Sequence, residues 1–236
     1  MREVCYANCS VIMFDLDGTL VDDHSATKSA VNVLAAEYSW IWRSAELAWR
    51  DWKALVPRYW ALYASGSLSL AEARRMRMAA FARAGGSLIS DVDVDELCGK
   101  FEAARLKAWR GYGDAAPALA SLGTYPLLVV SNGAGLEQRR KLGAAGLDGC
   151  FVDVVTSEQV GTMKPGRRIF EFACRVIGVP PDRALFVGDS VTSDVRGSYD
   201  CGLQPVWLDR SGSEDGQLGC GIGVVTSLAG LQGLLR

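Results

Sequence analysis

Three short polar segments of the sequence each follow an apolar run. Segment 15–19 reads DLDGT, segment 131–133 reads SNG and segment 188–190 reads GDS. In open parallel sheets, ligands bind beyond the carboxyl ends of the strands, where the ends of neighbouring strands lie together. If the apolar runs are parallel strands, these three segments meet at one site.

Four aspartates would gather at that site, namely Asp15, Asp17, Asp189 and Asp194. Like charges within a few ångströms raise one another's pKa unless a cation lies between them. Mg²⁺ is the common choice where carboxylates meet a phosphoryl group. The aspartates come from two distant segments rather than from one loop, so they do not match the calcium-loop pattern. We therefore expect Mg²⁺ as the cofactor.

Lys164 adds a positive charge in a turn, directly before Pro165. A phosphate dianion would be held by the metal, by this lysine, by the hydroxyl of Ser131 and by exposed backbone N–H groups. Taken alone, a Ser-Asn-Gly turn or a lysine before proline is more often an ordinary solvated turn. Together with the aspartates, these residues indicate phosphoryl chemistry.

The elements that must carry these segments are short apolar runs separated by longer helical patterns. The runs are continuous rather than alternating, which is typical of parallel strands covered on both faces. They are 11–14, 127–130, 184–187 and 205–208. Apolar residues between Ile169 and Ile177 recur at helical spacing, and the pattern ends at Gly178. The sequence predicts an α/β fold with a Rossmann-like parallel sheet.

The segment 22–111 differs from the rest of the chain. It has no comparable strand-like run and is rich in Ala, Trp, Arg and Glu, so we expect it to be wholly helical. Its Ser69-Leu70-Ala71-Glu72 is a capping-box pattern, which marks the start of a helix. The predicted organisation is an α/β core of residues 1–21 and 112–236, interrupted by a helical domain of residues 22–111.

In this order, the motifs resemble those of the haloacid dehalogenase (HAD) superfamily, in subfamily I, whose helical C1-type cap is inserted between the first and second motifs. The first motif matches 15–20, the second 131–133, the third Lys164-Pro165 and the fourth 188–194. The resemblance covers nearly the whole chain. It implies a catalytic core with an all-helical cap and a phosphatase-like activity.

The resemblance also implies a role for each motif residue. Asp15 would be the nucleophile, Asp17 the general acid/base and Lys164 a third catalytic residue. The implied binding roles are phosphate binding by Ser131, Asn132 and Lys164, and metal binding by Asp15, Asp17, Asp189 and Asp194. The metal contact of Asp17 would be through its backbone carbonyl. Asp194 would hold either the metal-bound water or the motif-three lysine.

The expected activity is Mg²⁺-dependent hydrolysis of a phosphomonoester through an aspartyl-phosphate intermediate. The expected substrate is a small metabolite such as a sugar phosphate, a phosphoglycolate-like acid or a nucleotide. A 2-haloacid dehalogenase would need no metal and no acid/base two residues after the nucleophile, so Asp17 argues against it. A phosphosugar mutase would share every motif. A catalytically silent HAD-fold binding module would not need Asp15, Asp17, Lys164 and Asp189 together.

Composition narrows the expected partners. The chain has 236 residues and a formal net charge of -2, which suggests neither a nucleic-acid footprint nor a basic membrane-binding face. Its apolar runs are too short to cross a bilayer, and the segment before Asp15 does not read as a secretory signal. The seven cysteines are scattered without C-x-x-C spacing, which favours reduced thiols. We expect a cytoplasmic monomer or homodimer that acts on a small phosphorylated metabolite, with no nucleic-acid polymer and no membrane as partner.

Overall fold

The structure is a computed structural model that describes residues 6, 8–87, 91–212 and 222–235. The chain divides into two compact units. The first consists of Met1–Asp22 with Arg110–Arg236, and the second of Asp23–Trp109. Among the helices of the described residues, none is long and apolar enough to span a membrane.

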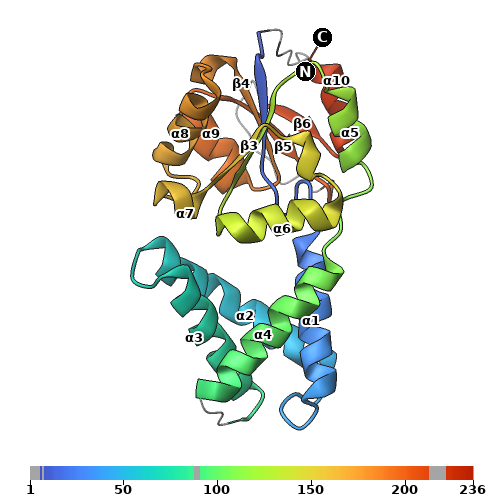
Figure 1. The fold of residues 1–236 in the computed structure, drawn as a ribbon, viewed down its shortest axis with the longest axis vertical. Coiled ribbons are helices and arrows are strands. Elements are labelled where there is room, and N and C mark those ends of the chain that lie inside the picture. Colours follow the sequence, from blue (N-terminus) through green and yellow to red (C-terminus); the bar gives the residue numbers. More distant parts are fainter. Residues whose placement is uncertain (1–5, 7, 88–90, 213–221, 236) are drawn as a thin grey trace. The chain divides into compact units, whose positions relative to one another are not determined.

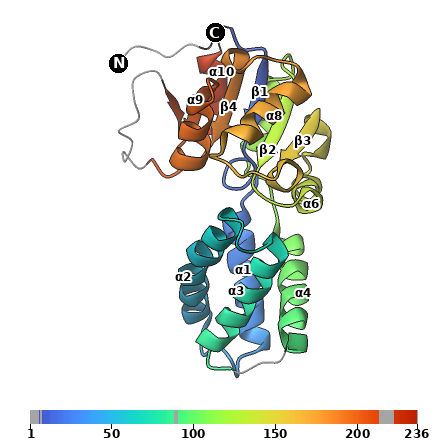
Figure 2. The ribbon, with the colours of Figure 1, turned by 90° about the vertical axis from the view of Figure 1, so that its left-hand side faces the viewer.

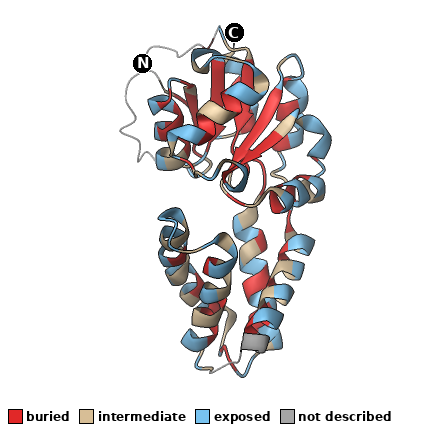
Figure 3. Ribbon diagram, turned by 60° about the vertical axis from the view of Figure 1, so that its left-hand side comes forward, coloured by how far each residue is buried: buried red, intermediate tan, exposed pale blue. Residues whose placement is uncertain are grey.

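In the first unit, the described residues form one six-stranded sheet in which every neighbouring pair is parallel (Figure 1). The strand order is β3-β2-β1-β4-β5-β6. The strands are β1 (Val11–Phe14), β2 (Leu127–Ser131), β3 (Asp153–Thr156), β4 (Ala184–Gly188), β5 (Gln204–Leu208) and β6 (Gly223–Val225). The four central strands are buried almost throughout (Figure 3), as expected for apolar runs covered on both faces. The predicted Rossmann-like α/β fold is confirmed.

Helices cover both faces of this sheet (Figures 1 and 2). They are α5 (Ala115–Ser121), α6 (Gly135–Ala145), α7 (Ser157–Val160), α8 (Arg167–Ile177), α9 (Gly197–Asp200) and α10 (Leu231–Leu234). Single 3₁₀ turns lie at Asp148–Cys150, Pro181–Arg183 and Leu228–Gly230, and a π-helical turn at Val191–Arg196. Helix α8 packs Ile169 and Phe170 into one cluster with Met13 and Phe186 of the sheet, while α5 and α6 lie over the other face.

In the second unit, the described residues form four helices: α1 (Asp23–Glu37), α2 (Ala45–Ala64), α3 (Leu70–Ala84) and α4 (Asp91–Ala108). Helix α3 begins where the capping box predicts, because Ser69 accepts from the Glu72 backbone N–H and the Glu72 side chain accepts from the Ser69 N–H. The unit has its own apolar core, in which Trp42 stacks on Phe81 at 4.3 Å between ring centroids and Trp52 is buried. Such a core lets the helices pack without the sheet.

The cysteines that the structure describes are all free thiols. They are Cys9, Cys98, Cys150, Cys174 and Cys201. The other two, Cys5 and Cys220, lie outside the described residues.

Candidate active site

The carboxyl ends of β1, β2 and β4 bring the three polar segments together. Asp15 directly follows β1, Ser131 is the last residue of β2, and Asp189 directly follows β4. Strand β1 pairs with both β2 and β4, and the Asp15 backbone N–H donates to the Val187 carbonyl at 2.9 Å. The three segments therefore share one edge of the sheet, where ligands bind in such folds.

The ammonium group of Lys164 lies between two carboxylates. Its Nζ is 2.5 Å from Oδ1 of Asp15 and 2.7 Å from Oδ1 of Asp194. All three side chains are buried, so the alternative in which Lys164 is a solvated surface lysine is wrong. A buried ammonium is costly unless it is paired, and here two carboxylates pair it.

Asp194 connects this lysine to the end of β4. It lies in the π-helical turn Val191–Arg196, a kind of turn that is frequent at functional sites. Its Oδ2 accepts a hydrogen bond from the Ser190 backbone N–H at 3.0 Å, while its Oδ1 faces Lys164. Asp194 therefore contacts the motif-three lysine, which is one of the two roles left open for it.

The side chain of Asn132 holds the main chain of Lys164. The Lys164 N–H donates to Oδ1 of Asn132 at 2.7 Å, and Nδ2 of Asn132 donates to the Lys164 carbonyl at 3.0 Å. The neighbouring Gly133 N–H donates to the Ser157 hydroxyl at 2.9 Å, which ties the same loop to the start of α7. Ser131 is buried at the end of β2. The second and third motifs are thus joined through hydrogen bonds.

Three carboxylates form a group suited to a metal ion. Oxygen atoms of Asp15, Asp189 and Asp194 lie within 4.8 Å of one another. The backbone of Gly18 makes room for this group: its φ is +86°, and a Cβ at that position would lie 2.3 Å from Oδ2 of Asp189. The Thr19 hydroxyl lies 3.3 Å from Oδ2 of Asp15. An all-oxygen, negatively charged set of this kind fits a hard cation such as Mg²⁺.

The pKa values of these residues reflect burial first and the neighbouring charges second. Burial raises the pKa of Asp15, the charge of Lys164 opposes this rise and the charge of Asp194 adds to it, so that the resulting pKa is about 6. Although Asp189 reaches solvent, desolvation by nearby protein atoms, followed by the charges of Asp15 and Asp194, raises its pKa to about 7. Burial lowers the pKa of Lys164, but the two carboxylates outweigh that effect and raise it above its ordinary value. One ammonium does not balance three carboxylates, and a divalent cation would relieve their repulsion.

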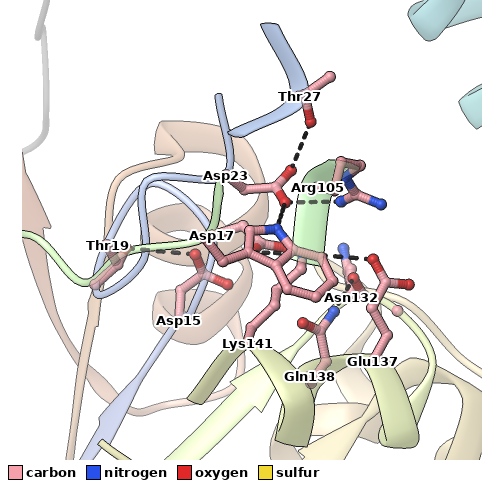
Figure 4. A network of polar contacts seen from close by, with 12 residues as sticks. Asp15, Asp17, Thr19, Asp23, Thr27, Arg105, Asn132, Glu137, Gln138 and Lys141 are labelled. Carbon is pink, nitrogen blue, oxygen red and sulfur yellow. Dashed lines mark hydrogen bonds and ion pairs between the residues drawn. The ribbon is translucent and has the colours of Figure 1, made fainter. Parts of the chain in front are cut away.

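The side chain of Asp17 lies outside the group of Asp15, Asp189 and Asp194, the only such group among the described residues. Both of its oxygens accept hydrogen bonds from Nζ of Lys141, at 2.7 Å and 2.6 Å (Figure 4). Lys141 belongs to α6. Its Nζ also lies 3.7 Å from Oε1 of Glu137, which is one turn earlier on that helix. An ammonium group that binds both oxygens restricts rotation of the Asp17 carboxylate.

Our sequence reasoning missed Lys141. It follows Arg139 and Arg140, and three consecutive basic residues usually indicate a solvated helix face. Two signals were available. Glu137 and Lys141 stand four residues apart, and their helix starts directly after the second motif.

Residues 9–199 match the family model for haloacid dehalogenase-like hydrolases. The chain is 28% identical over 230 residues to pyrimidine 5'-nucleotidase YjjG of Escherichia coli, with 95% of this chain and 96% of that protein covered. It is 26% identical over 211 residues to (S)-2-haloacid dehalogenase 2 of a Pseudomonas species, with 88% and 87% covered.

Solved structures show the same fold. The HAD-hydrolase YfnB from Bacillus subtilis, in a crystal form bound to magnesium, superposes with a TM-score of 0.80 at 22% identity. The match covers 97% of this chain and 99% of that one.

Proposed function

Since the chain belongs to the haloacid dehalogenase-like hydrolase family, we propose that it is a Mg²⁺-dependent phosphomonoester hydrolase acting through an aspartyl-phosphate on Asp15. The observation that carries this proposal is the buried contact of Lys164 with Asp15 and Asp194, next to the carboxylate of Asp189. A phosphoryl group bound here would meet a nucleophile, a fixed positive charge and a set of metal ligands.

The reaction would proceed in two steps on residues of this chain. In the first, a carboxylate oxygen of Asp15 forms a bond to phosphorus, the bond from phosphorus to the leaving oxygen breaks, and Asp17 donates a proton to that oxygen. In the second, water attacks the phosphorus, Asp17 takes the proton of the water, and the Asp15 carboxylate is released together with inorganic phosphate. Throughout, Lys164 offsets the negative charge of the transferring group.

Mg²⁺ would be held by the carboxylates of Asp15 and Asp189, with the Asp17 carbonyl and Asp194 as further contacts implied by the family resemblance. When bound, the cation neutralises carboxylate and phosphoryl charge, which otherwise repel each other. The magnesium in the YfnB crystal supports this choice of cation. The phosphoryl group of the substrate would contact Ser131, Asn132 and Lys164, as the family resemblance implies.

The substrate would be a small phosphorylated metabolite, and the helical domain of residues 22–111 would act as the cap that selects its leaving group. Pyrimidine 5'-nucleotides belong in the first test, because a relative aligned over nearly the whole chain is a pyrimidine 5'-nucleotidase. Sugar phosphates and phosphoglycolate-like acids complete the panel. A phosphosugar mutase would differ by activation with a bisphosphate.

A 2-haloacid dehalogenase is the second candidate, because one relative aligned over 88% of the chain carries that activity. The presence of Asp17 and the charge of the acidic group favour the phosphatase. The deciding experiment measures phosphate release from the panel, and chloride release from (S)-2-chloropropionate, with Mg²⁺ or excess chelator. We expect Mg²⁺-dependent phosphate release that Asp15→Asn abolishes. Chloride release in chelator without phosphate release would instead identify a dehalogenase.

A further inference from the structure

The contact between Lys141 and Asp17 is unusual in its burial. The side chain of Lys141 is 2% exposed, whereas that of Asp17 is 31% exposed. Lys141 lies on α6 and Asp17 on the loop after β1, so the contact joins positions 124 residues apart in the chain. The buried partner is thus the lysine, and the carboxylate that it holds still reaches solvent.

An ion pair on the same helix shows the ordinary alternative. Nη2 of Arg139 lies 2.9 Å from Oδ1 of Asp153, and the two side chains are 60% and 38% exposed. Such surface pairs contribute little to stability because water screens them. Burying an ammonium group instead carries a large desolvation penalty, and apolar replacements of buried ion pairs are often as stable as the pair itself. Stability alone therefore gives little reason for a buried lysine at position 141.

The geometry provides a functional reason. Because one ammonium group binds both oxygens of Asp17, it fixes the plane of that carboxylate. It also holds the carboxylate apart from the group formed by Asp15, Asp189 and Asp194, the only such group that the described residues contain. A freely rotating Asp17 could bind a cation held at that group, and its oxygens could then no longer transfer a proton.

We propose that Lys141 is a positioning residue, which holds Asp17 in the orientation that proton transfer to the leaving oxygen and from the attacking water requires. The proposal rests on the proposed function, in which Asp17 is the general acid/base. Lys141 takes no part in bond formation or cleavage. Its effect is therefore expected only in steps that move a proton through Asp17.

The test compares Lys141→Met with Arg139→Met, which removes the exposed ion pair of the same helix. With Mg²⁺ and an alkyl phosphate substrate, we expect Lys141→Met to lower kcat by about 10- to 100-fold, the range for a misplaced catalytic group, with KM changed by less than about threefold. Arg139→Met should behave like the wild type. With nitrophenyl phosphate, whose leaving group needs no proton, Lys141→Met should give a burst followed by slow turnover.

A double-mutant cycle separates positioning from a purely structural role. If Lys141 acts through Asp17, adding Lys141→Met to Asp17→Asn should lower kcat by less than about threefold more, because the group being positioned is already gone. Absence of the nitrophenol burst in Lys141→Met, or multiplicative losses in the double variant, would overturn the proposal. Lys141→Arg keeps a charged, two-pronged donor and should recover most of the activity.

A crystal structure of Lys141→Met gives a readout without activity. We expect the Asp17 carboxylate to be displaced or to occupy more than one orientation, whereas an unchanged Asp17 would refute the positioning role. If Lys141→Met does not fold, Lys141→Gln allows the same comparison. Absence of phosphate release by the wild type would count against the proposed function, and the position of Asp17 would still decide the role of Lys141.

Discussion

The side-chain amide of Asn132 spans the main chain of Lys164, accepting from its N–H at 2.7 Å and donating to its carbonyl at 3.0 Å. These two hydrogen bonds fix the position of the Lys164 main chain. The Nζ atom of its side chain lies 2.5 Å from Oδ1 of Asp15. Asn132, the residue after β2, thus helps to position the ammonium group of Lys164 next to Asp15, the residue after β1.

Asn132→Ala removes both bonds, and the Lys164 backbone loses its anchor. We expect kcat to fall by about 10- to 100-fold, since misplacement of a catalytic group by about 1 Å has effects of this size. Steady-state kinetics with Mg²⁺ and a phosphomonoester measure the change. Gln232→Ala, which removes a distant side-chain contact to the Ser121 carbonyl, is the control. Wild-type kcat in Asn132→Ala would show that the Lys164 backbone needs no such anchor.

Lys164→Met keeps most of the side-chain volume but removes the charge. We expect kcat to fall by about 10² to 10⁴-fold, because a preorganised charge that stabilises the transition state is lost. In chelator, the folded protein should also be destabilised by about 3–5 kcal/mol, because the buried carboxylates of Asp15 and Asp194 lose the ammonium group that pairs them. Activity assays and urea denaturation measure the two effects. Lys28→Met, at an exposed position of α1, should change neither. Near-native activity in Lys164→Met would remove the lysine from the mechanism.

Stability in chelator should fall as pH rises from about 4 to about 7. The pKa of Asp15 is raised to about 6 and that of Asp189 to about 7, above the value of about 4 for an aspartate in an unfolded chain. Their protonated forms therefore stabilise the fold, and this contribution is present below pH about 4 and lost as pH passes the raised values. Mg²⁺ binds the deprotonated carboxylates, so the increase in melting temperature with Mg²⁺ should grow over the same range.

Thermal denaturation at several pH values, with Mg²⁺ or chelator, measures this linkage. Asp189→Asn should make the melting temperature depend less on pH. Asp153→Asn, which removes the exposed ion pair with Arg139, should leave that pH dependence unchanged. A Mg²⁺ effect that is the same at pH 5 and pH 8 would contradict the assignment of these carboxylates as ligands.

Gly18→Ala should abolish Mg²⁺ binding, because the new Cβ would collide with the Asp189 carboxylate at 2.3 Å. The positive φ of +86° adds strain that any non-glycine residue would suffer. Gly178→Ala is the matched control, since its φ of +70° brings the same strain but no atom lies within 4 Å of the new Cβ. Calorimetric titration with Mg²⁺ should show loss of binding only in Gly18→Ala. Equal Mg²⁺ affinity in the two variants would show that the close approach of Asp189 is not required.

Much of this protein is readable from short-range patterns. Continuous apolar runs predicted parallel strands, and Ser69 with Glu72 predicted the start of α3, because both signals depend on residues adjacent in the chain. The positions of Asp15 and Asp189 directly after such runs placed them at one edge of the sheet. Local patterning was sufficient there because strand ends in a parallel sheet share a direction.

The pairing of charges was decided by the tertiary structure. Lys141 stands in a run of three basic residues on a helix with charges on several faces, so periodicity does not show which of them is buried. The family resemblance already placed Lys164 and Asn132 at the site, but the hydrogen bonds between the Asn132 side chain and the Lys164 main chain depend on the strand order that brings their loops together. Which lysine meets which aspartate depends on contacts over more than a hundred residues, and those form only when the whole sheet has assembled.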